Sequence, residues 1–253
     1  MSTILKLDGV VAGYGAGDIL KGVDLDVQAG TVTCLIGPNG AGKSTVLKTI
    51  SGLLRPKNGT VTFRGERIEK LAPKPRLLKG IVHVPQDRSL FPAMSVWDNL
   101  LMGGYALKDQ KAVKQRIAHA VEVFPICARR AHDHAGSLSG GEQKQVELAR
   151  TLVMDPGLIL LDEPSIGLDP KSRQQVFLSI RELAAAGRTV LLVEQNARSG
   201  LAASDFGAVL ESGVVRLVAT GASLLEDPAV ARLYLGAASA GHGLAQATTG
   251  PQG

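Results

Sequence analysis

The nine residues GPNGAGKST, residues 37–45, constrain the fold of this 253-residue chain more than any other stretch. They fit the pattern G-x-x-x-x-G-K-[ST], follow the apolar run TVTCLI and open a helical stretch, which is the context this phosphate-binding loop requires. Backbone N–H groups and the positive end of the helix then face an anion. A glycine-rich turn before an ordinary helix is the disfavoured alternative. The sequence predicts a nucleotide triphosphate site built from Gly37, Pro38, Asn39, Gly40, Ala41, Gly42, Lys43, Ser44 and Thr45.

Three side chains of this loop have separate predicted roles. We expect Lys43 to reach the β- and γ-phosphates and the Ser44 hydroxyl to bind Mg²⁺. Thr45 can reach the phosphates from the first turn of the helix. The loop therefore predicts two ligands together, a nucleotide triphosphate and Mg²⁺.

Two carboxylates follow the buried run LILL. Asp162 ends that run, where a charge is costly unless it meets a cation, and Mg²⁺ held with Ser44 is such a cation. Glu163 is placed to orient or deprotonate the attacking water. Solvated loop carboxylates are the alternative, which the nearby phosphate loop weakens.

Short apolar runs without alternation predict the core of the fold. TVTCLIG, GLILLDEP and TVLLVEQN are typical of parallel strands buried on both faces, and helical stretches separate them. Residues 4–30 and GTVTFRGERI alternate instead, as antiparallel strands do. We therefore predict an α/β fold of the P-loop NTPase class, with a RecA-like parallel core and an antiparallel β layer.

The organisation around this core is predicted from composition and periodicity. The segment from Met94 to His134 has helical periods and no strand run, which indicates a helical subdomain inserted at about residues 94–155. The basic stretch KPRLLKG, residues 74–80, is interpreted as a solvated helix face. We expect residues 1–236 to form the domain and the small, polar tail 237–253 to be disordered.

Two adjacent glycines mark the start of a further predicted helix in SLSGGEQKQVELAR. Ser139 and Glu142 form a capping box, but Gly140 and Gly141 each cost up to about 1 kcal/mol in a helical turn. Their bare N–H groups favour a second anion site. Because the chain already has a phosphate loop, this helix end suits a nucleotide held by another subunit.

The motifs GPNGAGKST, LSGGEQ, LILLDEP and SIGLD, in this order, resemble the ATPase subunit of ATP-binding cassette (ABC) transporters. The resemblance covers residues from about Ile4 to Gly236. It implies that two chains enclose two ATP molecules head to tail and that transmembrane permease subunits bind the ATPase. A cytoplasmic location on the inner membrane face, through those permeases, is implied as well.

The resemblance also implies roles for individual residues. Ser139, Gly140 and Gly141 match the signature that contacts the γ-phosphate of the opposite subunit's ATP, and Asp169 matches the loop crossing the dimer interface. Gln86 matches the glutamine that contacts Mg²⁺ and the attacking water. Tyr14 matches the aromatic residue that stacks on adenine, although a packed strand tyrosine is an open alternative.

Gln195 stands where this family normally has histidine. LVEQNA, MGGY, VFP and ARLYLG resemble the second ATPase subunit of branched-chain amino-acid importers, the LivF type. A glutamine amide can donate to a phosphate oxygen, but it cannot take up a proton near neutral pH. The resemblance therefore implies a hydrogen-bonding role for Gln195 and, beside a histidine-bearing ATPase, a heterodimer, with a homodimer as the alternative.

Composition excludes few classes of function, but it predicts that the chain itself does not cross a membrane. No apolar run approaches the length of a spanning helix, no signal peptide is visible, and Cys34 and Cys127 suit a reduced compartment. His132, Asp133 and His134 are interpreted as a solvated turn rather than a metal site. Trp97 is assigned either to core packing or to a permease contact.

The leading functional prediction is an ATP-hydrolysing subunit of an importer for branched-chain amino acids, served indirectly by an extracytoplasmic solute-binding protein. Import of urea or short amides is the second prediction. A soluble cassette ATPase acting on nucleic acid or ribosomes suits the net charge of +5. It is disfavoured because the interval between the phosphate loop and the signature is short, so no nucleic-acid partner is expected.

Overall fold

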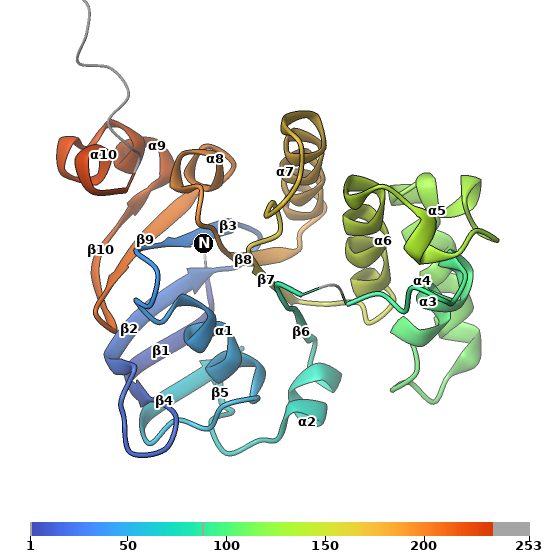
Figure 1. The fold of residues 1–253 in the computed structure, drawn as a ribbon. Helices are drawn as coiled ribbons and strands as arrows, with labels where there is room; N and C mark the ends of the chain where they lie inside the picture. The colour runs from blue at the N-terminus through green and yellow to red at the C-terminus, as the bar shows by residue number, and fades with distance from the viewer. Residues whose placement is uncertain (1, 88, 235–253) are drawn as a thin grey trace, which may run out of the picture.

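The computed structural model describes residues 2–87 and 89–234, whose strands form two sheets (Figure 1). The larger sheet has the strand order β10-β9-β3-β8-β7-β6 and is parallel except for the β9–β10 pair. The smaller sheet has the order β2-β1-β4-β5 and is antiparallel. The strands are β1 Thr3–Ala12, β2 Leu20–Gln28, β3 Val32–Ile36, β4 Asn58–Phe63, β5 Glu66–Arg67, β6 Ile81–Val84, β7 Leu158–Asp162, β8 Thr189–Val193, β9 Phe206–Glu211 and β10 Val214–Thr220.

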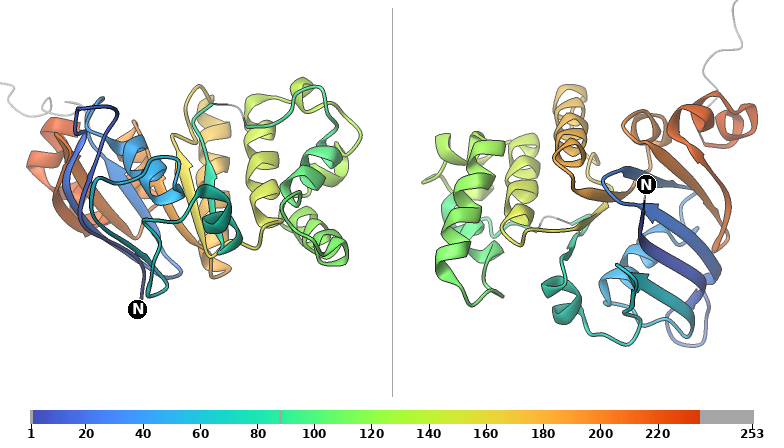
Figure 2. Two further views of the ribbon diagram at one scale, coloured as in Figure 1. Left: turned by 90° about the horizontal axis from the view of Figure 1, so that it is seen from below. Right: turned by 180° about the vertical axis from the view of Figure 1, so that it is seen from behind.

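Helices connect the parallel strands and cover both faces of the larger sheet (Figures 1 and 2). Successive strand residues point to opposite faces, and here both faces are buried. In β7, Leu158 and Leu160 belong to the core shared with α1 and the smaller sheet, whereas Ile159 and Leu161 belong to the core shared with the other helices. This two-sided burial explains the unbroken apolar runs. The helices are α1 Lys43–Ser51, α2 Pro73–Leu78, α3 Val96–Gly103, α4 Gln110–Val123, α5 Ile126–Arg129, α6 Gly140–Leu152, α7 Pro170–Ala185, α8 Ala197–Ala202, α9 Gly221–Glu226 and α10 Pro228–Tyr234.

The interval between β6 and β7 holds the helices α3 to α6, which stand to one side of the sheets in all three views (Figures 1 and 2). The predicted insert, about residues 94–155, contains these helices, and its separation as a subdomain stays a prediction. The predicted tail, residues 237–253, lies outside the described residues. Among residues 2–87 and 89–234, no helix combines the length and apolar character needed to cross a membrane.

The predicted α/β class with a parallel core and an antiparallel layer is confirmed. The hairpin of β9 and β10 was not predicted, although β9 pairs with the central strand β3. The interpretation of residues 74–80 as a solvated face was wrong for Arg76, which is only 1% exposed. Its guanidinium donates to the carbonyls of Thr49 and Ile50, so it caps the C-terminal end of α1.

Candidate functional site

The predicted phosphate loop joins β3 to α1 and has a backbone that requires glycine. Gly42 precedes the first residue of α1 with φ of 104°, and Gly40 has φ of 80°. A Cβ atom on Gly37 would lie 2.1 Å from the carbonyl oxygen of Leu210. Both positive φ values and this close approach exclude ordinary side chains. The loop therefore forms a tight turn at the N-terminal end of α1.

Lys43 is folded back over this loop. Its Nζ donates to the carbonyl oxygens of Gly37, at 2.8 Å, and Pro38, at 3.1 Å. Burial lowers the pKa of Lys43, while the carboxylates of Glu163 and Asp162 raise it. The ammonium group is thus held inside the loop, where phosphate oxygens would be better partners than backbone carbonyls.

Asp162 and Ser44 meet across the carboxyl ends of β7 and β3. The Ser44 hydroxyl donates to Asp162 Oδ1 at 3.0 Å. Asp162 is buried, with 4% of its surface exposed. Burial raises the pKa of Asp162, and the Ser44 hydrogen bond lowers it. A buried carboxylate beside a hydroxyl is an oxygen donor set that suits Mg²⁺. The residues present therefore fit this cation.

Glu163 continues the chain into a strained turn. Its φ is 47°, which is uncommon for a residue other than glycine. Gln86 Nε2 donates to Glu163 Oε2 at 3.0 Å, from the segment after β6. Burial and the neighbouring Asp162 both raise the pKa of Glu163. This carboxylate therefore has the position and environment of a water-orienting group.

A cavity of about 410 Å³ brings the predicted site residues together. It is lined from five separate parts of the chain, including Ile19, Asn39, Lys43, Ser44, Gln86, Glu163 and Gln195. Gln195 is exposed and follows β8 by two residues. The strand TVLLV therefore ends at the same cavity that the phosphate loop opens into.

Tyr14 lies in the loop between β1 and β2 and is 53% exposed. The Nζ of Lys48, on α1, is 6.0 Å from the centroid of its ring. The exposed ring excludes the alternative of a packed strand tyrosine. It leaves an aromatic face free beside the helix that follows the phosphate loop.

The signature residues begin α6, which stands on the far side of β7 from α1 (Figures 1 and 2). The capping box of Ser139 and Glu142 is present in both directions. Ser139 and Gly140 are exposed, whereas Gly141 is buried and its Cβ would lie 2.6 Å from Ser172 Oγ. Packing against α7 is thus one reason for the second glycine, which the sequence argument missed.

Asp169 caps α7. Its carboxylate accepts from the backbone N–H groups of Lys171 and Ser172, at 3.0 and 3.1 Å. The side chain is exposed at the end of the loop that runs from Glu163. A capping role in its own chain is therefore established for this residue.

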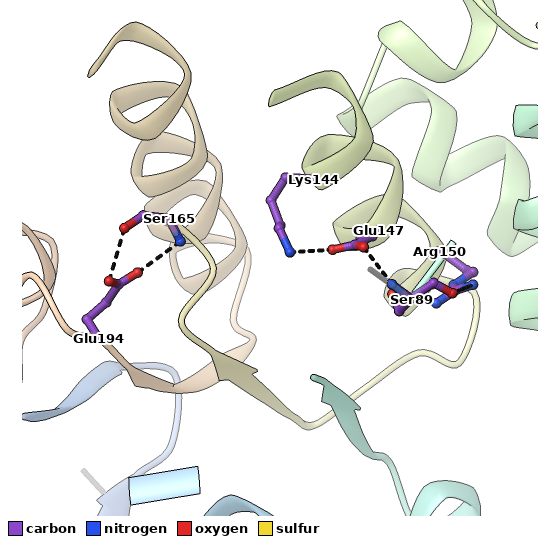
Figure 3. Close-up of polar contacts among 6 residues, drawn as sticks. All are labelled: Ser89, Lys144, Glu147, Arg150, Ser165 and Glu194. Carbon is purple, nitrogen blue, oxygen red and sulfur yellow. Dashed lines mark hydrogen bonds and ion pairs between the residues drawn. The ribbon is translucent and has the colours of Figure 1, made fainter. Parts of the chain in front are cut away.

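Two buried carboxylates near the site were not predicted to act (Figure 3). Glu194 accepts from the Ser165 N–H at 3.1 Å and from the Ser165 hydroxyl at 3.0 Å. Glu147, on α6, accepts from the Ser89 N–H at 2.9 Å and forms an ion pair with Lys144. The available signal for Glu194 was a carboxylate directly after an apolar strand, and for Glu147 a carboxylate on a buried helix face.

The phosphate loop between β3 and α1, with carboxylates at the end of β7, defines a nucleotide-binding ATPase of the P-loop class. The sequence profile of the family described as ABC transporter matches residues 20–166. The chain is 40% identical to the high-affinity branched-chain amino acid transport ATP-binding protein BraG of Pseudomonas aeruginosa, over 92% of this chain and 100% of BraG. The chain belongs to the ABC transporter family, as one of its ATP-binding subunits.

Further relatives agree with this membership. The probable branched-chain amino acid transport ATP-binding protein LivF of Archaeoglobus fulgidus is 38% identical over 89% of this chain and 95% of LivF. The lipopolysaccharide export ATP-binding protein LptB of Escherichia coli is 34% identical over 92% of this chain and 97% of LptB. The ADP conformation of MJ1267, an ATP-binding cassette of an ABC transporter, superposes with a TM-score of 0.84 at 30% identity, covering 93% of this chain and 100% of MJ1267.

Proposed function

We propose that this chain binds and hydrolyses MgATP to energise an importer for branched-chain amino acids. The observation that carries the ATPase part is that Lys43, Ser44 and Glu163 line one cavity, with Asp162 hydrogen-bonded to Ser44 behind it. The similarity to BraG and LivF over most of the chain supports the substrate class. The relative that serves lipopolysaccharide export has a lower identity, 34%, so the similarities favour import over export.

The proposed ATP site uses the groups already described. Lys43 exchanges its carbonyl partners for the β- and γ-phosphates, and the N–H groups of the loop hold the same anion. Ser44, Asp162 and Gln86 hold Mg²⁺. When bound, this ion neutralises charge on the phosphates and on Asp162. Tyr14 offers its exposed ring to the adenine, and Thr45 supports the phosphates from the first turn of α1.

Glu163 orients the attacking water in this proposal. Its carboxylate lines the cavity and accepts a hydrogen bond from Gln86, and burial raises its pKa, which favours proton uptake. Gln195 donates an amide hydrogen to the γ-phosphate from the end of β8. Because an amide does not titrate near neutral pH, Gln195 stabilises charge without exchanging protons.

A second ATPase subunit completes the site in this proposal. Ser139 and Gly140 are exposed on α6, which is separated from the phosphate loop of its own chain by β7. Ser139, Gly140 and Gly141 therefore serve the ATP of the partner subunit, and Asp169 lies at the interface. The ATP-binding cassette MJ0796, 26% identical to this chain, is dimeric in a post-hydrolysis state bound to ADP and Pi. A histidine-bearing partner would give a heterodimer.

The permeases place the subunit at the cytoplasmic face of the membrane in this proposal, and an extracytoplasmic solute-binding protein delivers the solute. Affinity purification of the full chain should recover its permeases. Reconstitution of this complex in vesicles then allows ATP hydrolysis to be measured with the solute-binding protein and leucine, isoleucine, valine or urea.

Stimulation by the three branched amino acids is the expected result. Stimulation by urea instead would replace the substrate class with the second prediction. Outward movement of solute without a binding protein would contradict import, and no ATP hydrolysis at all would contradict the ATPase assignment.

A further inference from the structure

The turn that carries Glu163 is fastened to β8 on both sides of that residue. On one side, the Glu163 N–H donates to the carbonyl oxygen of Val193 at 2.9 Å, where the β7–β8 pairing ends. On the other side, the N–H and hydroxyl of Ser165 both donate to the carboxylate of Glu194 (Figure 3). Val193 and Glu194 are consecutive residues at the end of β8. The chain at this place therefore accepts hydrogen bonds from two residues of the turn, Glu163 and Ser165.

Two further hydrogen bonds reach Glu163: the Ile166 N–H donates to its carbonyl oxygen at 3.2 Å, and Gln86 Nε2 donates to its carboxylate at 3.0 Å. Glu163 and Ile166 line the cavity of the phosphate loop and also line a second cavity of about 430 Å³. Side chains that line a cavity have fewer packing contacts than side chains in a core, so packing alone does not fix their positions. The left-handed φ of Glu163 adds strain of order 1 to 3 kcal/mol, which persists only where surrounding contacts hold it. The hydrogen bonds of Glu163 and Ser165 to Val193 and Glu194 therefore contribute to fixing the position of this turn.

Glu194 is an unfavourable residue for packing alone. It is 2% exposed, and in the described part of the chain its hydrogen-bond partner is Ser165 rather than a lysine or arginine. Burial of a carboxylate costs free energy, and the positive charge of Arg173 offsets only part of that cost, because burial is the larger effect on the pKa of Glu194. An apolar residue would fill the same volume at lower cost. The presence of a carboxylate at this point is explained by the two hydrogen bonds that it receives from the turn.

We propose that Glu194 is a positioning residue for ATP hydrolysis: by holding Ser165 it fixes the turn 163–166 and, through that turn, the carboxylate of Glu163. Gln195, the next residue, lines the same cavity as Glu163. Glu194 therefore links the two groups that face the γ-phosphate. The inference rests on the proposed function, because it assigns Glu163 to the attacking water.

The test compares variants of the full chain with wild type, each purified with its partner subunits, by steady-state hydrolysis of MgATP. Glu194→Ala removes both hydrogen bonds and should lower kcat by at least about tenfold, because small displacements of a reacting group are costly. KM for MgATP should change by less than about twofold, because Lys43 and the loop are untouched. Glu194→Gln can accept from the Ser165 N–H and donate to its hydroxyl, so it should retain kcat to within about threefold.

Ser165→Ala removes the hydroxyl that donates to Glu194 and so tests the same interaction from the other side. It should lower kcat by less than Glu194→Ala, and the double variant should be no slower than Glu194→Ala alone, because both changes remove one interaction. If Glu194→Ala does not fold, Ser165→Ala decides: a wild-type kcat in that variant overturns the proposal.

Asp205→Ala is the matched control. Asp205 also accepts one backbone N–H, from Val32, and one side-chain donor, from Arg181, at the end of β3 away from the phosphate loop. It should lower the melting temperature without lowering kcat. A kcat of Glu194→Ala equal to wild type, or a loss of the same size in Asp205→Ala, overturns the proposal. Absence of hydrolysis by the unchanged complex, or full turnover with Glu163→Gln, contradicts the proposed function instead.

Discussion

Gln86 and Glu163 are joined by a hydrogen bond of 3.0 Å although 77 positions separate them in the sequence. The bond forms because β6 and β7 are parallel neighbours, so the segments that follow them leave the sheet at the same edge. Gln86 also begins the segment that leads to α3 and the other helices of the insert. The residue that we assign to the attacking water is therefore in direct contact with the connection to these helices.

Glu163→Gln should abolish turnover while leaving nucleotide binding intact. Loss of a positioned acid or base typically lowers the rate by about 10² to 10⁴ fold, whereas Lys43 and the phosphate loop remain unchanged. Phosphate release measures the first effect, and equilibrium binding of a fluorescent ATP analogue measures the second. A variant that binds the analogue poorly would show instead that Glu163 supports the site as a whole.

Gln195→Ala should lower kcat by about 10² to 10³ fold, because removal of one donor from a developing charge typically costs about 2.7 to 4 kcal/mol. Gln195→His is the matched variant, since a neutral imidazole can donate the same hydrogen bond. We expect it to retain turnover. If Gln195→Ala hydrolyses ATP at the wild-type rate, the phosphate contact comes from the partner subunit and not from this strand.

Glu194→Gln should make the folding stability less dependent on pH. Burial raises the pKa of Glu194 to about 7, from the ordinary glutamate value of 4.5. The folded chain therefore holds this proton more tightly than the unfolded chain. The corresponding stabilisation is complete below about pH 4.5 and is lost as the pH rises through about 7.

The difference corresponds to about 3 kcal/mol between acidic and mildly alkaline pH. Urea unfolding of wild type and Glu194→Gln should accordingly differ most at about pH 8, where the amide variant is the more stable, and least at about pH 4. Equal stabilities at both pH values would mean that Glu194 titrates normally. A less stable amide variant at alkaline pH would mean that the charged form is the favoured one.

Glu147→Ala should destabilise the chain by about 3 to 5 kcal/mol, because it leaves Lys144 buried without its partner and removes the acceptor of the Ser89 N–H. The double variant Lys144→Met with Glu147→Gln is the matched comparison. It removes both charges and keeps an acceptor for Ser89, so we expect its stability to lie within about 1 kcal/mol of wild type. Urea unfolding measures the free energy of unfolding, from the midpoint of the transition, provided that the slope m is the same in all variants. Equal losses in both variants would show that the charge pair itself stabilises the helix contact.

The elements nearest the phosphate loop could be predicted because their signals are local. The loop 37–45, the strand before it and Asp162 at the end of LILL all depend on residues that are neighbours in the chain. The contacts of Arg76, Glu147 and Glu194 could not be predicted in the same way. Each side chain reaches a backbone group at least 26 positions away, and the partner depends on which strands lie beside one another.

The sequence by itself determined the phosphate loop, the paired carboxylates, the buried strands and the membership that these motifs indicate. Their information lies in spacing within one segment, because loop geometry and strand burial are local properties. The tertiary structure alone decided that Gln86 meets Glu163, that Glu194 holds Ser165 and that the signature helix stands apart from the phosphate loop. The strand order β3-β8-β7-β6 sets these meetings, and no short segment of the chain encodes that order.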